Sequence, residues 1–345
     1  MFDFLRPIRR PKVIPGFATP EDIAVMPMFL REISKELDPS IEVDSPIGTT
    51  DTKHFLKYTG DGPFVILAPN NAGKQSLIFV PACLNWTGPL ICNDNTGEVY
   101  NLCAFLRYDN VGPVVQFLAG SDLPTCQFNP LDTIPWGEPE ESSYLHLLTQ
   151  FLFDDQTPDV EDTDKLAAAI VRNLIKDNHK YNSDINLKDI RILAKNLESE
   201  KMQLRINDIC RPYFTYVNTN DDFMERKIDI ALLRIEEKLS VFDEDKSISF
   251  MFSKTSFDLT SLNNKNYTVY IGSVPGASLE INRLMKFALK VLINYVRKFD
   301  KKTLVLLPEN LHQKFFSTSE DTTFISLKNL LGIHRFYSVV FIGGR

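Results

Sequence analysis

The stretch Phe64-Val-Ile-Leu-Ala-Pro-Asn-Asn-Ala-Gly-Lys-Gln-Ser76 is followed by an apolar run at residues 77–84 and then by Pro89-Leu-Ile-Cys92. The simplest interpretation of this order is a buried strand, a loop rich in Pro, Asn and Gly, a helix and a second strand. Consecutive strands joined by a helix run parallel. The stretch therefore predicts a βαβ unit and, with it, a parallel α/β sheet.

Short apolar runs later in the chain predict further buried strands. They lie at residues 114–118, 268–271, 303–307 and 338–342. Between the first and the second of these strands, residues 140–242 have apolar side chains at helical spacing, as in Leu187, Ile190 and Leu193. A long amphipathic helix is expected from about residue 279 to 298, directly before the strand at 303.

These elements predict an α/β domain with a mainly parallel sheet, interrupted by an all-α insertion. The α/β domain comprises residues 16–139 and 243–345, and the insertion comprises residues 140–242. Residues 1–15 form a basic leader, in which Arg6, Arg9, Arg10 and Lys12 surround Phe2, Phe4 and Leu5. The leader either docks on a membrane surface or a partner, or is a loosely ordered terminus.

The loop after the first strand lies where a phosphate-binding loop must lie. In such a loop, glycines let backbone amides wrap the phosphates, a lysine reaches the β- and γ-phosphates, and a Ser or Thr hydroxyl holds Mg²⁺. Gly73 and Lys74 fit this pattern, whereas Ala68 replaces the first glycine and Gln75 replaces the Ser or Thr. A turn that merely ends a strand is the alternative. The candidate nucleotide-binding residues are Ala68, Asn70, Asn71, Gly73, Lys74, Gln75 and Ser76.

Composition limits the other classes of function. The formal net charge of -7 argues against a standing attraction to nucleic acid, so binding of DNA is not expected from the charge. The five cysteines include no Cys-x-x-Cys pair and the five histidines are scattered, so neither a disulfide framework nor a zinc site is predicted. A reducing cytoplasm is the expected location. No apolar run reaches about 18 residues, so no transmembrane helix is expected.

Five segments, in order, resemble the coupling proteins of bacterial type IV secretion and conjugation of the TraG/TraD type. The segment from residue 80 to 107 is similar to that family's helix, strand and "DxKGE" motif followed by an arginine. The matching residues are Gly16-Phe-Ala-Thr19; Val80-Pro-Ala-Cys-Leu84 with Trp86, Gly88, Asp94, Gly97, Glu98 and Arg107; Phe128-Asn-Pro-Leu-Asp132; Thr255-Ser-Phe-Asp-Leu259; and Tyr267-Thr-Val-Tyr-Ile-Gly272.

The resemblance implies a RecA-like P-loop NTPase domain with an all-α insertion, and it also exposes departures from the family. A strand ending in Asp-Glu should carry the metal-binding aspartate and the catalytic glutamate, but here Leu307 is followed by Pro308 and Glu309. Glu309 is the candidate catalytic residue, with a surface carboxylate as the alternative. Thr96 replaces the lysine of "DxKGE". The chain ends after the 338–342 strand, where the family continues to a glutamine that senses the γ-phosphate, so a degenerate and truncated member is expected.

Three hypotheses follow for function. The first is a pseudo-ATPase that acts as an adaptor or scaffold in a secretion or conjugation apparatus, because phosphoryl transfer depends on the metal and charge that are missing. The second is an active ATPase motor subunit that uses Lys74 and Glu309, with Asp94 as the metal ligand. The third is a receptor surface for protein substrates, formed by the insertion.

No cofactor is certain, and ATP, bound weakly, is the candidate. The expected partners are secretion-system proteins or protein substrates, and an oligomer is compatible with the sequence. The expected location is the cytoplasm, with peripheral contact at the inner membrane as a variant of it.

Overall fold

The structure is a computed structural model, and it describes residues 29–30, 41–43, 56–58, 64–69, 75–120, 125–153, 161–196, 221–299, 303–307 and 336–344. Its main feature is a six-stranded parallel sheet with the order β4-β9-β8-β5-β7-β6. Every strand predicted from an apolar run is part of this sheet, which confirms the α/β class. The strands are β4 (Phe64–Pro69), β5 (Leu90–Asn93), β6 (Val114–Ala119), β7 (Thr268–Ser273), β8 (Thr303–Leu307) and β9 (Phe336–Gly344).

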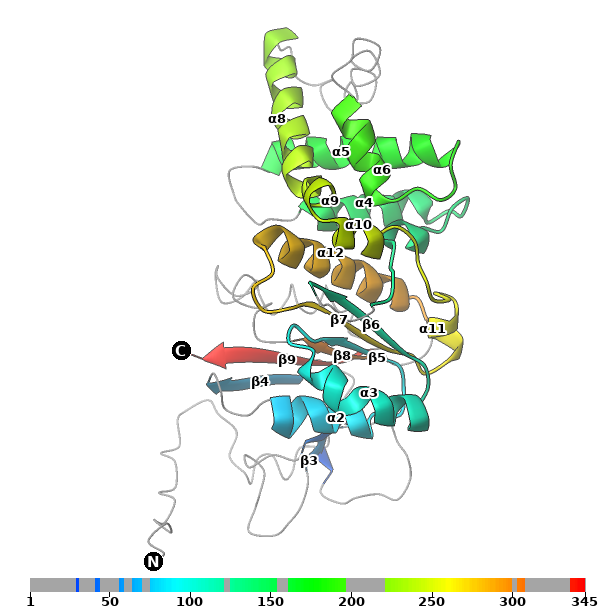
Figure 1. Cartoon of the computed structure of the whole chain (residues 1–345), viewed down its shortest axis with the longest axis vertical. Coiled ribbons are helices and arrows are strands. Elements are labelled where there is room, and N and C mark those ends of the chain that lie inside the picture. The colour runs from blue at the N-terminus through cyan, green and yellow to red at the C-terminus, as the bar shows by residue number, and fades with distance from the viewer. Residues whose placement is uncertain are drawn as a thin grey trace, which may run out of the picture.

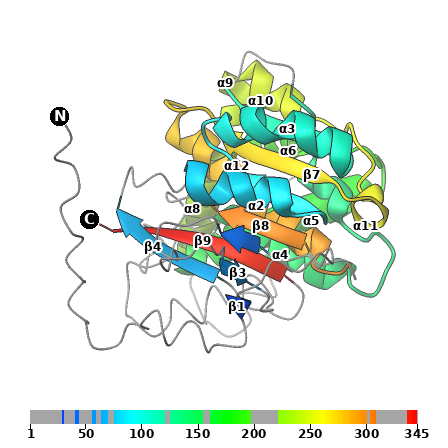
Figure 2. The ribbon, with the colours of Figure 1, turned by 90° about the horizontal axis from the view of Figure 1, so that it is seen from below.

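The strand order determines which helices cover which face. From β4 to β5 and from β5 to β6 the chain moves toward one edge of the sheet, whereas from β7 to β8 it moves back. Because parallel crossovers are right-handed, the helices of the two directions lie on opposite faces. Figure 1 shows α2 (Val80–Asn85) and α3 (Glu98–Asn110) below the sheet and α12 (Leu279–Val296) above it, and Figure 2 views the molecule from the side of α2 and α3.

Two hydrophobic cores correspond to these two faces. The smaller core packs α2 and α3 against strand residues such as Leu90, Cys92 and Leu304. The larger core packs α12 against the alternate strand residues, such as Ile91 and Val305, and continues into the helical layer above α12. The alternation of neighbours such as Ile91 and Cys92 between the cores is the period-2 pattern of a strand that is buried on both faces.

Residues 140–242 contribute only helices among the part of this range that the structure describes. These helices lie beyond α12 from the sheet (Figure 1). The helical character of this range is therefore confirmed for the described residues, while the domain boundaries at 139 and 243 stay a prediction. The helices are α4 (Glu141–Phe153), α5 (Glu161–His179), α6 (Leu187–Lys195), α8 (Asp221–Leu239) and α9 (Val241–Glu244), followed by α10 (Lys246–Met251).

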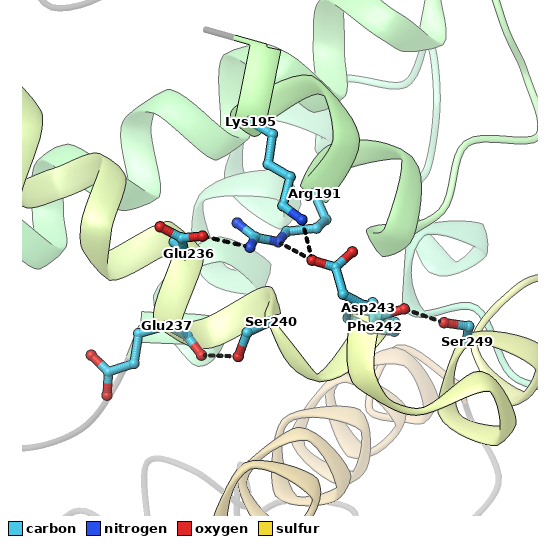
Figure 3. Close-up of polar contacts among 8 residues, drawn as sticks. All are labelled: Arg191, Lys195, Glu236, Glu237, Ser240, Phe242, Asp243 and Ser249. Carbon is cyan, nitrogen blue, oxygen red and sulfur yellow. Dashed lines mark hydrogen bonds and ion pairs between the residues drawn. The ribbon is translucent and has the colours of Figure 1, made fainter. Parts of the chain in front are cut away.

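A buried arginine holds three of these helices together. Arg191 on α6 has a side chain that is only 4% exposed, and its guanidinium donates to Glu236 of α8 at 2.8 Å and to Asp243 of α9 at 3.3 Å. Lys195, one turn later, also pairs with Asp243 (Figure 3). Asn186 begins α6 with a capping box, in which Asn186 and Asp189 each accept from the other's backbone N–H. The helical layer is thus fixed by charge as well as by apolar packing.

The chain leaves the sheet domain and returns to it through two segments that hydrogen-bond to each other. Asn129 N donates to Thr255 Oγ1 at 3.1 Å, and Thr255 N donates to Asp132 Oδ2 at 3.0 Å. Asn129 Nδ2 donates to Asp132 Oδ1 and to the carbonyl of Ile185, both at 2.9 Å. These contacts join the 128–132 and 255–259 segments into a neck between the sheet and the helices. Short helices flank it, η2 (Pro130–Thr133) and α11 (Ser261–Asn264).

A small antiparallel sheet near the N-terminus was not predicted. Its order is β1-β3-β2, with β1 (Phe29–Leu30), β2 (Ile41–Val43) and β3 (Leu56–Tyr58). Strands of two or three residues are too short to show the alternation by which a strand is recognised in a sequence. Among the described residues, no helix is both long enough and apolar enough to cross a membrane.

Candidate nucleotide site at the carboxyl edge of the sheet

The carboxyl ends of all six parallel strands lie at one edge of the sheet, because the strands run the same way. At this edge β5 ends at Asn93, between β8 and β7. The connection after β5 runs through α3 on one face, whereas the connection after β7 runs through α12 on the other. A parallel sheet opens a crevice for ligands at such a reversal, so the end of β5 is the expected site.

The structure places three of the predicted nucleotide-binding residues at this edge. Ala68 lies at the end of β4 and pairs with Gly343 of β9. Gln75 and Ser76 begin the helical segment η1 (Gln75–Phe79), which continues directly into α2. The remaining predicted site residues lie outside the described residues: Asn70, Asn71, Gly73, Lys74 and Glu309.

Two departures from the family pattern contact each other. Gln75 Nε2 donates to Thr96 Oγ1 at 3.3 Å, although the two residues are 21 positions apart. Thr96 Oγ1 in turn donates to Asp94 Oδ1 at 3.3 Å. The helix that follows the phosphate loop is thereby linked through two side chains to the carboxylate at the end of β5. We call Gln75, Thr96 and Asp94 the edge network.

Asp94 is buried, and both of its oxygens accept hydrogen bonds. It is 4% exposed, and its second oxygen, Oδ2, accepts from the backbone N–H of Tyr100 in the first turn of α3 at 2.8 Å. Burial raises the pKa of Asp94, and the hydrogen bonds from Tyr100 and Thr96 partly offset that rise. A carboxylate that accepts from a first-turn N–H stabilises the start of a helix. Asp94 therefore acts as a cap for α3.

The described side chains at this edge do not fit Mg²⁺. The ion takes oxygen ligands in a near-ideal octahedron, usually with one or two carboxylates. Each oxygen of Asp94 already accepts a hydrogen bond from the protein. Gln75 offers an amide in place of the hydroxyl. No group of three or more His, Cys, Asp or Glu side chains within the described ranges could hold a metal ion.

On the other face of β5, the edge has a polar group without a partner. Asn93 is 7% exposed, and its Oδ1 has no hydrogen-bond partner. Nearby, β7 approaches the chain after β5 so closely that a Cβ at Gly272 would lie 2.5 Å from the carbonyl oxygen of Asp94. Gly272 is thus required by the position of Asp94. The only signal of this contact in the sequence is a glycine in a strand interior.

A buried arginine fixes the opposite end of α3. Arg107 is 1% exposed, and its guanidinium donates to the carbonyls of Cys83 and Trp86, both at 2.5 Å, and of Gly88 at 2.9 Å. It also donates to Thr268 Oγ1 at 2.5 Å. Burial lowers the pKa of Arg107. This arginine is the one that follows the segment similar to the "DxKGE" motif. It joins α3 to the end of α2 and to β7, so its role is structural.

Comparison with known proteins agrees with this architecture. A model of the family described as "Type IV secretory system Conjugative DNA transfer" matches residues 34–307. The chain belongs to this family. This match confirms the resemblance to coupling proteins that the sequence indicated. A search of curated proteins returns no match.

Solved structures of a conjugative coupling protein are similar to this chain. The bacterial conjugative coupling protein TrwBdeltaN70, in complex with sulphate, matches with TM-score 0.61 at 10% identity over 82% of this chain and 63% of that one. TrwB with the GTP analogue GDPNP matches with TM-score 0.58 at 10% identity over 82% and 64% of the two chains. TrwB with ADP and Mg²⁺ matches with TM-score 0.58 at 9% identity over 82% and 63%. The fold is that of TrwB, a RecA-like P-loop domain, and the chain spans less than two thirds of those chains.

Proposed function

We propose that this chain is a non-hydrolysing member of the coupling-protein family, which acts as an adaptor or scaffold in a secretion or conjugation apparatus. The observation that carries the proposal is the edge network. Where a working site needs a hydroxyl and a free carboxylate for Mg²⁺, this chain has Gln75 and Asp94 bonded through Thr96. Both oxygens of Asp94 accept hydrogen bonds from the protein, and these bonds would have to rearrange before the carboxylate could hold a metal.

Catalysis of phosphoryl transfer needs charge neutralisation at the transferred group, and each contributing group is worth orders of magnitude in rate. In this chain the aspartate that should follow β8 is Pro308, and the hydroxyl that should follow Lys74 is absent. Lys74 and a helix start still attract anions. Weak binding of ATP without hydrolysis is therefore the expected behaviour.

The second candidate function, an active motor, is favoured by one observation. Asp94 is a carboxylate at the end of β5, and β5 pairs directly with β8, where the metal-binding aspartate should be. A motor would require Asp94 to exchange its hydrogen bonds from Thr96 and Tyr100 for a metal. Capping of α3 would be lost in that exchange, which costs about 1 kcal/mol.

Phosphate release and calorimetry test the proposal. We expect purified protein to release phosphate from MgATP no faster than the Lys74→Ala variant. We expect a Kd for ATP no tighter than about 100 μM, which corresponds to roughly 5.5 kcal/mol of binding, with or without Mg²⁺. Micromolar, Mg²⁺-dependent binding or turnover that Lys74→Ala abolishes would overturn the pseudo-ATPase. If Asp94→Asn abolished it too, Asp94 would be the metal ligand of a motor.

The partners proposed for the chain are proteins of the secretion system or their protein substrates, with the helical insertion as the receptor surface. The insertion is built for a fixed shape, because Arg191 and the neck hold its helices to one another and to the sheet domain. Direct DNA binding is not proposed, because the net charge of -7 opposes it. The proposed location is the cytoplasm, with peripheral contact at the inner membrane.

A further inference from the structure

Helix α3 carries an apolar stripe on its outer face. Its inner face is formed by Val99, Cys103 and Arg107, which are buried against the sheet. On the outer face, four large apolar or aromatic side chains are exposed at neighbouring helical positions. They are Leu102 (60% exposed), Phe105 (76%), Leu106 (46%) and Tyr108 (69%), and we call them the α3 stripe.

The exposure of the α3 stripe does not come from a loosely attached helix. Asp94 caps the first turn of α3, and Arg107 anchors its last turn by four hydrogen bonds. A rigid helix that presents a contiguous apolar surface to solvent marks an interaction site. Single exposed apolar residues are ordinary, but four on one helix face are a surface that another segment covers.

The exposed charged residues of α3 itself are both acidic. Glu98 and Asp109 are exposed at the two ends of the helix, while the single basic residue of α3, Arg107, points inward and is buried. The occupant that complements this surface is therefore apolar and basic. An acidic segment would be repelled by Glu98 and Asp109, and a purely polar segment would leave the aromatic side chains uncovered.

Residues 2–12 have that composition. Phe2, Phe4, Leu5 and Ile8 supply apolar side chains, and Arg6, Arg9, Arg10 and Lys12 supply positive charge, with Asp3 as the single acid. This composition stands out in a chain whose net charge is -7. We propose that residues 2–12 dock on the α3 stripe of the same chain, with aromatic side chains on Phe105 and Leu102 and with basic side chains toward Glu98 and Asp109.

The tether makes the intramolecular contact feasible. Residues 13–28 separate the docking segment from β1, and 16 extended residues reach up to about 55 Å, which spans a domain of this size. A tethered segment has an effective concentration in the millimolar range, so an individually weak contact suffices to hold it. The proposal is independent of whether the chain hydrolyses ATP.

Photo-crosslinking in the full-length chain tests the proposal. A photoreactive benzoylphenylalanine is introduced at Phe105, where 76% exposure allows the change without loss of folding. After irradiation at micromolar protein, we expect mass spectrometry to find residues 1–12 as the cross-linked peptide. The matched control has the same group at Leu233 on α8, an apolar residue of 62% exposure in the insertion, and should not cross-link to the leader.

A second variant tests the charge. Changing Arg6, Arg9 and Arg10 to Glu should lower the yield of the cross-link by about fivefold, which corresponds to roughly 1 kcal/mol from weak exposed ion pairs. Failure of residues 1–12 to cross-link from position 105 would overturn the proposal. A cross-link between light and heavy isotope-labelled copies would assign the α3 stripe to a second copy instead. If, with phosphatidylserine vesicles added, position 105 cross-linked to lipid in place of residues 1–12, the α3 stripe would be assigned to a membrane surface.

Discussion

Replacing Arg107 by methionine tests the clamp at the end of α3. Methionine fills much of the same space but donates no hydrogen bond, so the carbonyls of Cys83, Trp86 and Gly88 and the hydroxyl of Thr268 would lose their donor in a region that is 1% exposed. Four lost partners at about 1 kcal/mol each give about 4 kcal/mol of destabilisation. The guanidinium no longer has to be desolvated, and this gain reduces the net loss to about 2–4 kcal/mol.

Urea unfolding followed by circular dichroism measures this loss. Thr268→Val is the matched control, because it removes one acceptor and leaves the guanidinium with its three carbonyls, so we expect a loss of about 1 kcal/mol. Arg107→Lys keeps the charge but cannot reproduce the planar fork, and its loss should lie between the two. If Arg107→Met unfolded within about 0.5 kcal/mol of the natural protein, as a surface substitution does, the clamp would not stabilise the fold.

Two further predictions concern the helical layer. Arg191→Met should lower the free energy of unfolding more than Lys195→Met does, because Arg191 is 4% exposed and donates to both Glu236 and Asp243, whereas Lys195 is exposed and pairs with Asp243. Urea unfolding compares the two variants, and equal losses would contradict the reasoning. Asn129→Ala should loosen the neck, because Asp132 Oδ1 and the Ile185 carbonyl lose their donor. Amide hydrogen exchange should then become faster at residues 128–132 and 255–259 but not in α3. Unchanged exchange would show that the neck does not depend on Asn129.

The fold could be predicted because its strands are short apolar runs with clear breaks. Leu90-Ile-Cys92 and Leu304-Val-Leu-Leu307 are uniformly apolar, as strands buried on both faces must be. The helical range was recognisable from spacing alone, as Leu187 and Ile190 show by their complete burial. The strands β1 to β3 were missed because two or three residues carry no periodicity.

The candidate site was less predictable, because its contacts join residues far apart in the chain. Gln75 and Thr96 each stood out in the sequence as departures, but nothing local indicated that one donates to the other. The same is true of the neck, where Asp132 and Thr255 meet across 123 positions of the sequence. A motif match suggested that both segments matter, but only the packing shows that they bond to each other. The roles of Lys74 in phosphate binding and of Glu309 in catalysis stay predictions, since both residues lie outside the described residues.

Gln75 and Thr96, the two residues at the edge that differ from the family pattern, are explained by their contact with each other. A lysine at position 96 would place an ammonium beside the carboxylate of Asp94, and it would have no hydroxyl to bridge Gln75 and Asp94. A serine or threonine at position 75 would be too short to reach Thr96 across the same span. With glutamine at 75 and threonine at 96, side-chain hydrogen bonds hold the start of η1 to the residues just before α3. The contact between Gln75 and Thr96 is an internal one, while Asn93 Oδ1 at the same edge stays without a hydrogen-bond partner. The two substitutions thus join the helical segment after the phosphate loop to the carboxylate that caps α3.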